Sequence, residues 1–110
     1  MLGIDDDGDA IQAARESAAL NAGAEVSLQV TDFRVATLDP VDLVLANLTG
    51  GLLQSAAARL QGLTMPGGRL ILSGFMEHEE EESVCGFNEC SVERRAQEDE
   101  WMCVTLASSR

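Results

Sequence analysis

The stretch "VDLVLANLTGGLLQSAAARLQGLTMPGGRLILSGF" (residues 41–75) decides the fold class of this chain. Residues 41–48 form a continuous apolar run, which is typical of a strand buried on both faces of a parallel sheet. Two glycines, Gly50 and Gly51, end that run. A buried strand that stops at glycines and leads into a helix favours an α/β arrangement.

The rest of the stretch completes a strand-helix-strand unit. Four apolar positions share one helical face: Leu53, Ala56, Ala57 and Leu60. The "MPGG" segment at 65–68 predicts a tight turn, and residues 69–75 predict another buried strand. Strands that alternate with helices in this way predict a mostly parallel sheet.

Toward the N-terminus, "LGIDDDGDAIQAARESAALNAG" (residues 2–23) repeats this order. Residues 2–4 are expected to end a strand, and Gly23 can close the helix that follows. Small or apolar residues recur at helical spacing: Ala10, Ala13, Ala14, Ser17 and Ala18.

Acidic residues fill the junction between this strand and this helix. Asp5 lies at the carboxyl end of the strand, where doubly wound sheets bind ligands, and a carboxylate there can accept both hydroxyls of a ribose. Asp7 is expected to cap the helix, while Asp6 and Asp9 favour its positive end. All these acids could serve the helix alone, and a calcium loop is a weaker alternative because residues from 11 onward already predict helix.

Two more polar residues end predicted strands. Asp32 closes the strand predicted at 25–30 and leads into a loop over 31–40, where it could accept from an adenine amino group or cap the loop. Asn47 closes the most hydrophobic strand, where its amide could orient a substrate group or form a turn. His78 is the only histidine and is expected in solvent, so no metal ligand cluster is predicted.

The C-terminal third predicts a different pattern. Residues 76–87 favour a short acidic helix, and 88–97 and 101–108 favour an antiparallel hairpin around "EDE" at 98–100. Trp101 is expected to pack on the core. The predicted fold is therefore a single α/β domain over residues 1–110, with a mostly parallel sheet that ends in an antiparallel hairpin.

Charge narrows the range of partners. The chain carries 19 acidic and seven basic residues, all seven of them arginine, for a net charge of −12. Such a surface repels phosphate backbones, so we expect no direct nucleic-acid binding and favour a basic protein partner. No apolar run approaches the roughly 18 residues of a membrane span, so a cytoplasmic location is the expectation.

Four segments together resemble one enzyme family. Gly3 to Gly23, Asn47 to Leu53, Gly67 to Gly74 and Glu98 to Trp101 resemble the C-terminal catalytic domain of the bacterial methyltransferases that modify large-subunit ribosomal protein eleven. The resemblance covers nearly the whole chain and implies a Rossmann-like class I methyltransferase sheet. It also implies S-adenosylmethionine as cofactor and a ribosomal protein amine as substrate.

The resemblance assigns roles to single residues. Asp5 would bind the ribose hydroxyls of the cofactor, and Asp32 would lie near its adenine. Asn47 would act as a catalytic residue beside the transferred methyl, contacting the cofactor and orienting the substrate amine. Such a transfer depends on positioning and on a deprotonated nucleophile, and it requires no metal.

The family also has a strand and a Gly-rich loop upstream of the segment that resembles Gly3 to Gly23. We therefore expect an N-terminally truncated domain, in which the strands ending at Asp5 and Asn47 lack a shared neighbour. They would either pair directly or leave a gap whose free edge could form a homodimer. The functional prediction is a methyltransferase catalytic-domain fragment, inactive or weak alone, and the alternative is a non-catalytic α/β remnant or partner-binding module.

Overall fold

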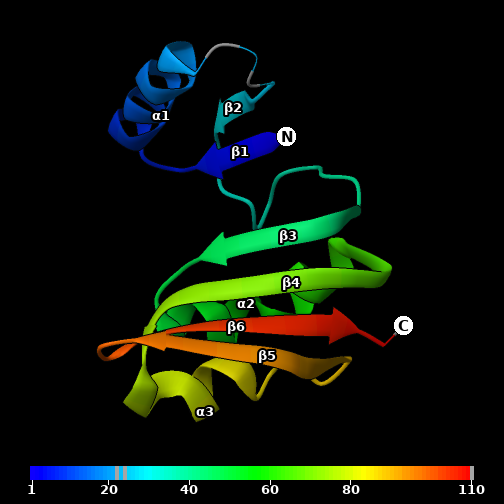
Figure 1. Cartoon of the computed structure of the whole chain (residues 1–110). Helices are drawn as coiled ribbons and strands as arrows, with labels where there is room; N and C mark the ends of the chain where they lie inside the picture. The colour runs from blue at the N-terminus through cyan, green and yellow to red at the C-terminus, as the bar shows by residue number, and fades with distance from the viewer. Residues whose placement is uncertain (22, 24, 110) are drawn as a thin grey trace. The chain divides into compact units, whose positions relative to one another are not determined.

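A computed structural model describes residues 1–21, 23 and 25–109. The elements follow one another in the order β1 (Leu2–Asp5), α1 (Gly8–Leu20), β2 (Ser27–Val30), β3 (Val41–Asn47), α2 (Gly50–Gly62), β4 (Thr64–Met76), η1 (Glu77–Glu79), α3 (Glu80–Val84), β5 (Cys90–Glu98) and β6 (Trp101–Ser108) (Figure 1). This order confirms the predicted alternation of strands and helices, including the final hairpin.

The chain divides into two compact units, Met1–Leu38 and Asp39–Arg110. Among the described residues, β1 and β2 form one sheet and β3, β4, β5 and β6 form another. The two arrangements expected for β1 and β3 stay predictions, as does the single domain over residues 1–110.

The first unit is a small strand-helix-strand motif. β1 and β2 are parallel, with Asp5 opposite Val30. Helix α1 connects them and buries Ile11, which is 3% exposed. The predicted apolar stripe is only partly correct, because Ala13 and Ser17 lie in solvent. The helix ends with Asn21 as its C-cap, and Gly23 follows with a φ of +90°, the left-handed geometry that favours glycine.

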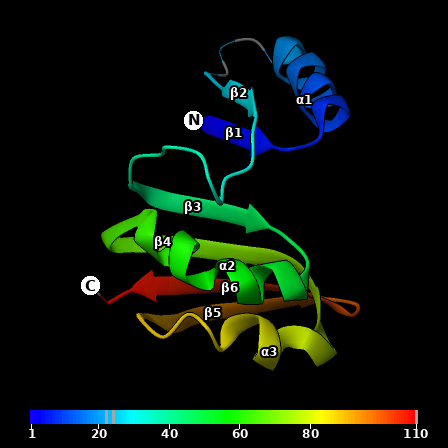
Figure 2. The same cartoon turned by 180° about the vertical axis from the view of Figure 1, so that it is seen from behind.

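The second unit contains a four-stranded sheet in the order β3-β4-β6-β5. β3 and β4 are parallel, and β6 runs antiparallel to both β4 and β5. Helices α2 and α3 cover the same face of this sheet, as the two opposite views show (Figures 1 and 2). The mostly parallel sheet with a C-terminal antiparallel hairpin is thus confirmed for this unit.

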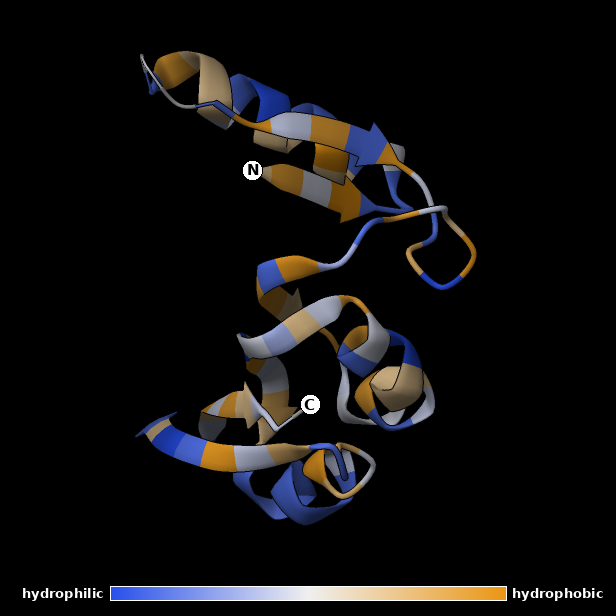
Figure 3. Ribbon diagram, turned by 90° about the vertical axis from the view of Figure 1, so that its right-hand side faces the viewer, coloured by the Kyte–Doolittle hydropathy of each residue, from blue (hydrophilic) through white to orange (hydrophobic). Residues whose placement is uncertain are grey.

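The core of the second unit lies between the sheet and α2. The predicted face of α2 is confirmed, because Leu53, Ala56, Ala57 and Leu60 are all buried. The sheet contributes fully buried side chains from two strands: Leu70, Leu72 and Phe75 of β4, and Val104 and Leu106 of β6. In contrast, α3 is strongly hydrophilic (Figure 3).

A buried side chain of α2 binds the backbone of the turn between α3 and β5. Gln61 of α2 donates to the carbonyl of Gly86 at 3.3 Å and accepts from the backbone N–H of Glu89 at 2.7 Å. Gln61 is itself buried. This amide therefore fixes the turn that leads into the hairpin.

The burial predicted for β3 on both faces is wrong. Leu43 and Leu45 are 49% and 62% exposed, and among the described residues Ala46 is the buried position of this strand. Leu43 and Leu45 alternate with Ala46 along the strand, so they lie on the face of the sheet that α2 and α3 do not cover, and β3 is also an edge strand. Trp101 is also 52% exposed and not in the core, because it begins β6 beside the hairpin turn.

Strand β4 extends further than predicted. The "MPGG" segment was predicted to form a tight turn before the strand, but it belongs to β4 itself. At the start of β4, Thr64 pairs with Val41. A register shift between Val41 and Leu43 accommodates Gly67, whose φ of +77° bends the strand. The turn residues thus produce an irregularity within a long strand.

Candidate active site

Asp5 occupies the junction between β1 and α1. Its carbonyl accepts from the N–H of Thr31 at 3.0 Å, which extends the pairing with β2. Its side-chain Oδ1 accepts from the N–H of Asp7 at 2.9 Å. Among the described residues, Oδ2 accepts no hydrogen bond, and the side chain lies in solvent. The local turn therefore fixes the carboxylate and leaves one oxygen for a ligand.

Asp7 has the structural role that the sequence predicts. It is the N-cap of α1, and its Oδ1 accepts from the N–H of Asp9 at 2.9 Å. Because α1 already begins at Gly8, the alternative of a calcium loop starting at Asp5 does not agree with the backbone. Of the acids at the junction, Asp7 is thus the one that caps α1.

Asp32 follows β2 closely, as Asp5 ends β1. Since the two strands are parallel and adjacent, their carboxyl ends meet, and the structure brings Asp5 and Asp32 to the same edge of the small sheet. The carbonyl of Asp32 accepts from the N–H groups of Val35 and Ala36, at 3.2 and 3.0 Å. Asp32 therefore begins a compact turn at this edge.

An arginine that the sequence analysis did not single out binds the Asp32 carboxylate. The guanidinium of Arg34 donates from Nε to Oδ1 at 3.0 Å and from Nη2 to Oδ2 at 2.8 Å. The backbone N–H of Arg34 donates to Oδ1 at 2.9 Å. The Asp-x-Arg spacing indicates the backbone contact, because an Asp side chain often binds the backbone two residues on. The spacing does not indicate the ion pair with the guanidinium.

These contacts shift both pKa values. The hydrogen bonds from the Arg34 side chain and backbone hold the pKa of Asp32 below its usual value. The Asp32 carboxylate in turn raises the pKa of Arg34 above its usual value. Asp32 is thus an ionised acceptor whose oxygens already have one cationic partner.

Asn47 is the last residue of β3, in the second unit. It lies opposite Ser73 of β4, and its side chain is exposed. The next N–H, that of Leu48, donates to the carbonyl of Ser73 at 3.0 Å. Asn47 therefore ends a parallel strand at its carboxyl end, as the sequence predicts.

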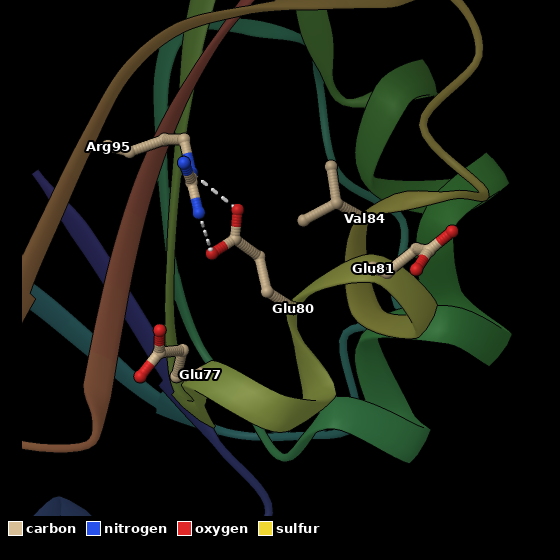
Figure 4. A pocket seen from close by; sticks show the side chains of 5 residues that line it. All are labelled: Glu77, Glu80, Glu81, Val84 and Arg95. Atoms are coloured by element: carbon tan, nitrogen blue, oxygen red, sulfur yellow. Dashed lines mark hydrogen bonds and ion pairs between the residues drawn. The ribbon is translucent and has the colours of Figure 1, made fainter.

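A pocket of the second unit lies between α3 and β5. It has a volume of about 450 Å³ and is lined by Glu77, Glu80, Glu81, Val84 and Arg95 (Figure 4). Arg95 donates from Nε and Nη2 to the two oxygens of Glu80, at 2.5 and 2.7 Å, and this raises the pKa of the guanidinium. Asn47 does not line this pocket, so the pocket forms no part of the candidate site.

Within residues 1–21, 23 and 25–109, no cluster of three or more His, Cys, Asp or Glu side chains could hold a metal ion. In the same described residues, no helix is long and apolar enough to cross a membrane.

Solved structures with the same fold define the class. The structure is similar to a ribosomal protein L11 methylase from Lactobacillus delbrueckii subsp. bulgaricus, with a TM-score of 0.89 at 22% identity over 99% of this chain and 58% of that chain. It is also similar to an RNA methyltransferase from Salinibacter ruber solved with S-adenosyl-L-homocysteine, with a TM-score of 0.74 at 18% identity over 97% and 64% of the two chains. The fold is thus the Rossmann-like fold of class I methyltransferases, as predicted.

Sequence comparison identifies the family within that class. Residues 1–109 match the profile of the ribosomal protein L11 methyltransferase (PrmA) family. The curated ribosomal protein L11 methyltransferase of Teredinibacter turnerae is 35% identical over 106 residues, which are 96% of this chain and 36% of that protein. The chain belongs to the ribosomal protein L11 methyltransferase family, and it spans about a third of the length of the curated relatives it matches.

Proposed function

We propose that this chain takes part in the transfer of a methyl group from S-adenosylmethionine to an amine of a ribosomal protein. The observation that carries the proposal is the placement of three polar side chains. Asp5, Asp32 and Asn47 each lie at or just beyond the carboxyl end of a parallel strand. Ligands of open α/β sheets bind at these ends, and the family membership of the chain supports a methyltransferase site there.

Asp5 is proposed to bind the ribose of the cofactor. A ribose diol needs acceptors for two hydroxyl hydrogens, and the free Oδ2 of Asp5 is such an acceptor. The Oδ1 atom is held by the N–H of Asp7 at 2.9 Å, so the carboxylate is oriented before any ligand arrives. The carboxylate oxygens at this position therefore fit the hydroxyl donors of a ribose.

Asn47 is proposed to contact the cofactor and to orient the substrate amine. When bound, S-adenosylmethionine supplies a methyl group on a positively charged sulfur. The side-chain oxygen of Asn47 can accept an N–H of the amine, which directs the nitrogen lone pair toward the methyl carbon. The cofactor would supply the methyl group with its sulfur as the leaving group, Asn47 would hold the amine nitrogen in line with the methyl carbon, and the proton of the methylated amine would pass to solvent.

Asp32 is proposed to lie near the adenine amino group. Its two oxygens have lone pairs beyond those used by Arg34, so an additional donor can bind. The bound guanidinium would hold the carboxylate in one orientation. Of the three residues, Asp32 has the smallest proposed share in binding.

The substrate class agrees with the charge of the chain. Ribosomal proteins are commonly basic, and a net charge of −12 attracts a basic partner. The same charge supports the absence of direct nucleic-acid binding. Since ribosomal proteins are made in the cytoplasm, a cytoplasmic location is part of the proposal.

Calorimetric titration of the 110-residue chain with S-adenosylhomocysteine tests the proposed function. We expect measurable binding that weakens about tenfold or more in Asp5→Asn, because hydrogen bonds to charged groups contribute about 1.5–3 kcal/mol. Asp9→Asn is the matched control, since it removes the same charge in the first turn of α1. This variant should bind as the unsubstituted chain does. A folded chain that binds nothing would instead favour the partner-binding module.

A second proposal concerns the free edge of β3. Three apolar side chains of this edge strand are exposed, Val41, Leu43 and Leu45, and such an edge can pair with another chain. We propose that two copies pair through it as a homodimer. Sedimentation should show a dimer that dissociates in Leu45→Lys but not in Val35→Lys, which changes another exposed apolar residue outside the sheet. A monomer at all concentrations would contradict this proposal.

A further inference from the structure

Gly74 lies in an irregular part of β4, directly beside the end of β3. The pairing of β4 with β6 shifts register between Ser73 and Phe75, so Gly74 is the extra residue of a β-bulge. Its φ is +95°, a conformation that side chains other than glycine's rarely adopt. Bulges recur next to active sites, where they redirect a neighbouring side chain.

The space above Gly74 is occupied by Asn47. A Cβ atom added at Gly74 would lie 2.6 Å from the side-chain oxygen of Asn47 and 2.6 Å from the backbone oxygen of Leu48. Both distances are shorter than a nonbonded carbon can approach oxygen. The backbone of β4 therefore comes as close to the end of β3 as the absence of a side chain allows.

We propose that Gly74 is a positioning residue for Asn47, because its missing side chain and its bulge set where the Asn47 amide lies. This inference rests on the role proposed for Asn47 above. The strand pairing supports it: Asn47 is opposite Ser73, and the N–H of Leu48 binds the carbonyl of Ser73 at 3.0 Å. The backbone of β4 thus bounds the Asn47 amide on one side, and its other side faces solvent.

A second glycine of β4, Gly67, allows the contact with Asn47 to be distinguished from the effect of backbone strain. Gly67 also has a positive φ, +77°, and also lies in an irregular part of β4. A Cβ added at Gly67 would meet no atom within 4 Å. Gly67→Ala therefore introduces the same kind of backbone strain as Gly74→Ala without touching Asn47.

The test uses the full 110-residue chain and the side-chain amide signals of its three asparagines in proton–nitrogen NMR spectra. The Asn47 pair is assigned by its loss in Asn47→Ala. We expect this pair to move by more than its linewidth in Gly74→Ala and to stay in place in Gly67→Ala, while the signals of Asn21 and Asn88 stay in both. An Asn47 pair that stays in Gly74→Ala, or that moves equally in Gly67→Ala, would overturn the proposal.

A measurement on the unsubstituted chain covers the case in which Gly74→Ala does not fold. The close approach predicts a nuclear Overhauser cross-peak between the α protons of Gly74 and the side chain of Asn47. Its presence supports the proposal, and its absence from a folded, fully assigned chain would overturn it.

Binding of S-adenosylhomocysteine then links position to function. Gly74→Ala and Asn47→Ala should weaken binding by similar factors, and the double variant should weaken it no further, because both changes act through one amide. Independent, multiplicative losses would contradict a positioning role. If neither the unsubstituted chain nor Gly67→Ala binds, the proposed function fails while the NMR result still decides the position of Asn47.

Discussion

The two units of this chain have the same strand-helix alternation but very different interiors. Among the described residues, Ile11 is the buried hydrophobic side chain of the first unit, whereas the second unit buries large side chains from α2, β4 and β6. The first unit has two paired strands and the second has four. Two strands and one helix offer few neighbours, so such a motif is marginally stable by itself.

This difference shows that local pattern and stability are separate properties. Helix α1 is capped by Asp7, β1 and β2 are in register, and each local choice agrees with its element. The second unit adds long-range burial, with α2 packed on one face of a sheet. We therefore expect most of the free energy of unfolding to come from residues 39–109.

The largest expected effect is that of Phe75→Ala. Phe75 is fully buried in β4, and its truncation should lower the free energy of unfolding by about 3–5 kcal/mol. Urea denaturation measures the change. Val92→Ala, on the exposed side of β5, is the control and should change it by less than about 0.5 kcal/mol. Equal effects would show that the second unit has no dominant core.

Ile11→Ala tests the other side of the comparison. Truncating this buried residue of α1 should cost about 2 kcal/mol locally, the low end for such a change because few groups surround it. Hydrogen exchange should show faster exchange of amides in β1 and β2 and unchanged protection in β4 and β6. Loss of protection in β4 would mean that the two units unfold together. Leu20→Ala, at an exposed site in the same helix, is the control.

Asp7→Ala should have a smaller effect, confined to α1. It removes the acceptor for the N–H of Asp9, and loss of such a cap costs about 1 kcal/mol. Hydrogen exchange of the first turn of α1 measures the change. Asp6→Ala removes the same charge without removing a cap, and an equal effect from it would mean that charge and not capping is responsible.

The smallest effect is the pH dependence of the Asp32–Arg34 pair. The pKa of Asp32 lies below its usual value of 3.8, so the pair stabilises the folded state above that pH and loses this contribution as the pH falls through the lowered pKa. Asp32→Asn should lower Tm at pH 6, only slightly because an exposed pair is screened by solvent. It should lower Tm less at pH 3, where less of Asp32 is ionised. The same difference at both pH values would show that ionisation of Asp32 is not involved.

The sequence was sufficient where the pattern is local. The helix face of Leu53 and Leu60, the cap at Asp7 and the hairpin at the C-terminus are all as predicted. Each of these depends on residues close in sequence or on a strong periodicity. The alternation of elements also indicated the parallel pairing of β3 with β4.

The sequence was insufficient where burial or side-chain contacts depend on which elements lie next to a strand. The apolar run of β3 indicates side chains suited to burial, but Leu43 and Leu45 are exposed because they lie on the face of this edge strand that α2 and α3 do not cover. The ion pair of Asp32 with Arg34 and the approach of Gly74 to Asn47 likewise depend on local or cross-strand geometry that composition does not encode. Among the candidate site residues, position along the strand was predictable and side-chain partners were not.

The buried amide of Gln61 limits how the connection between α3 and β5 can change in length. An exposed turn usually tolerates inserted residues, because nothing outside the turn depends on its length. Here one side chain of α2 binds both Gly86 and Glu89, so its two polar atoms fix the separation of those two backbone groups. A residue inserted between them would change that separation and break one of the two bonds. This turn is therefore a poor place for an affinity tag or a loop graft, although Asn88 within it lies in solvent.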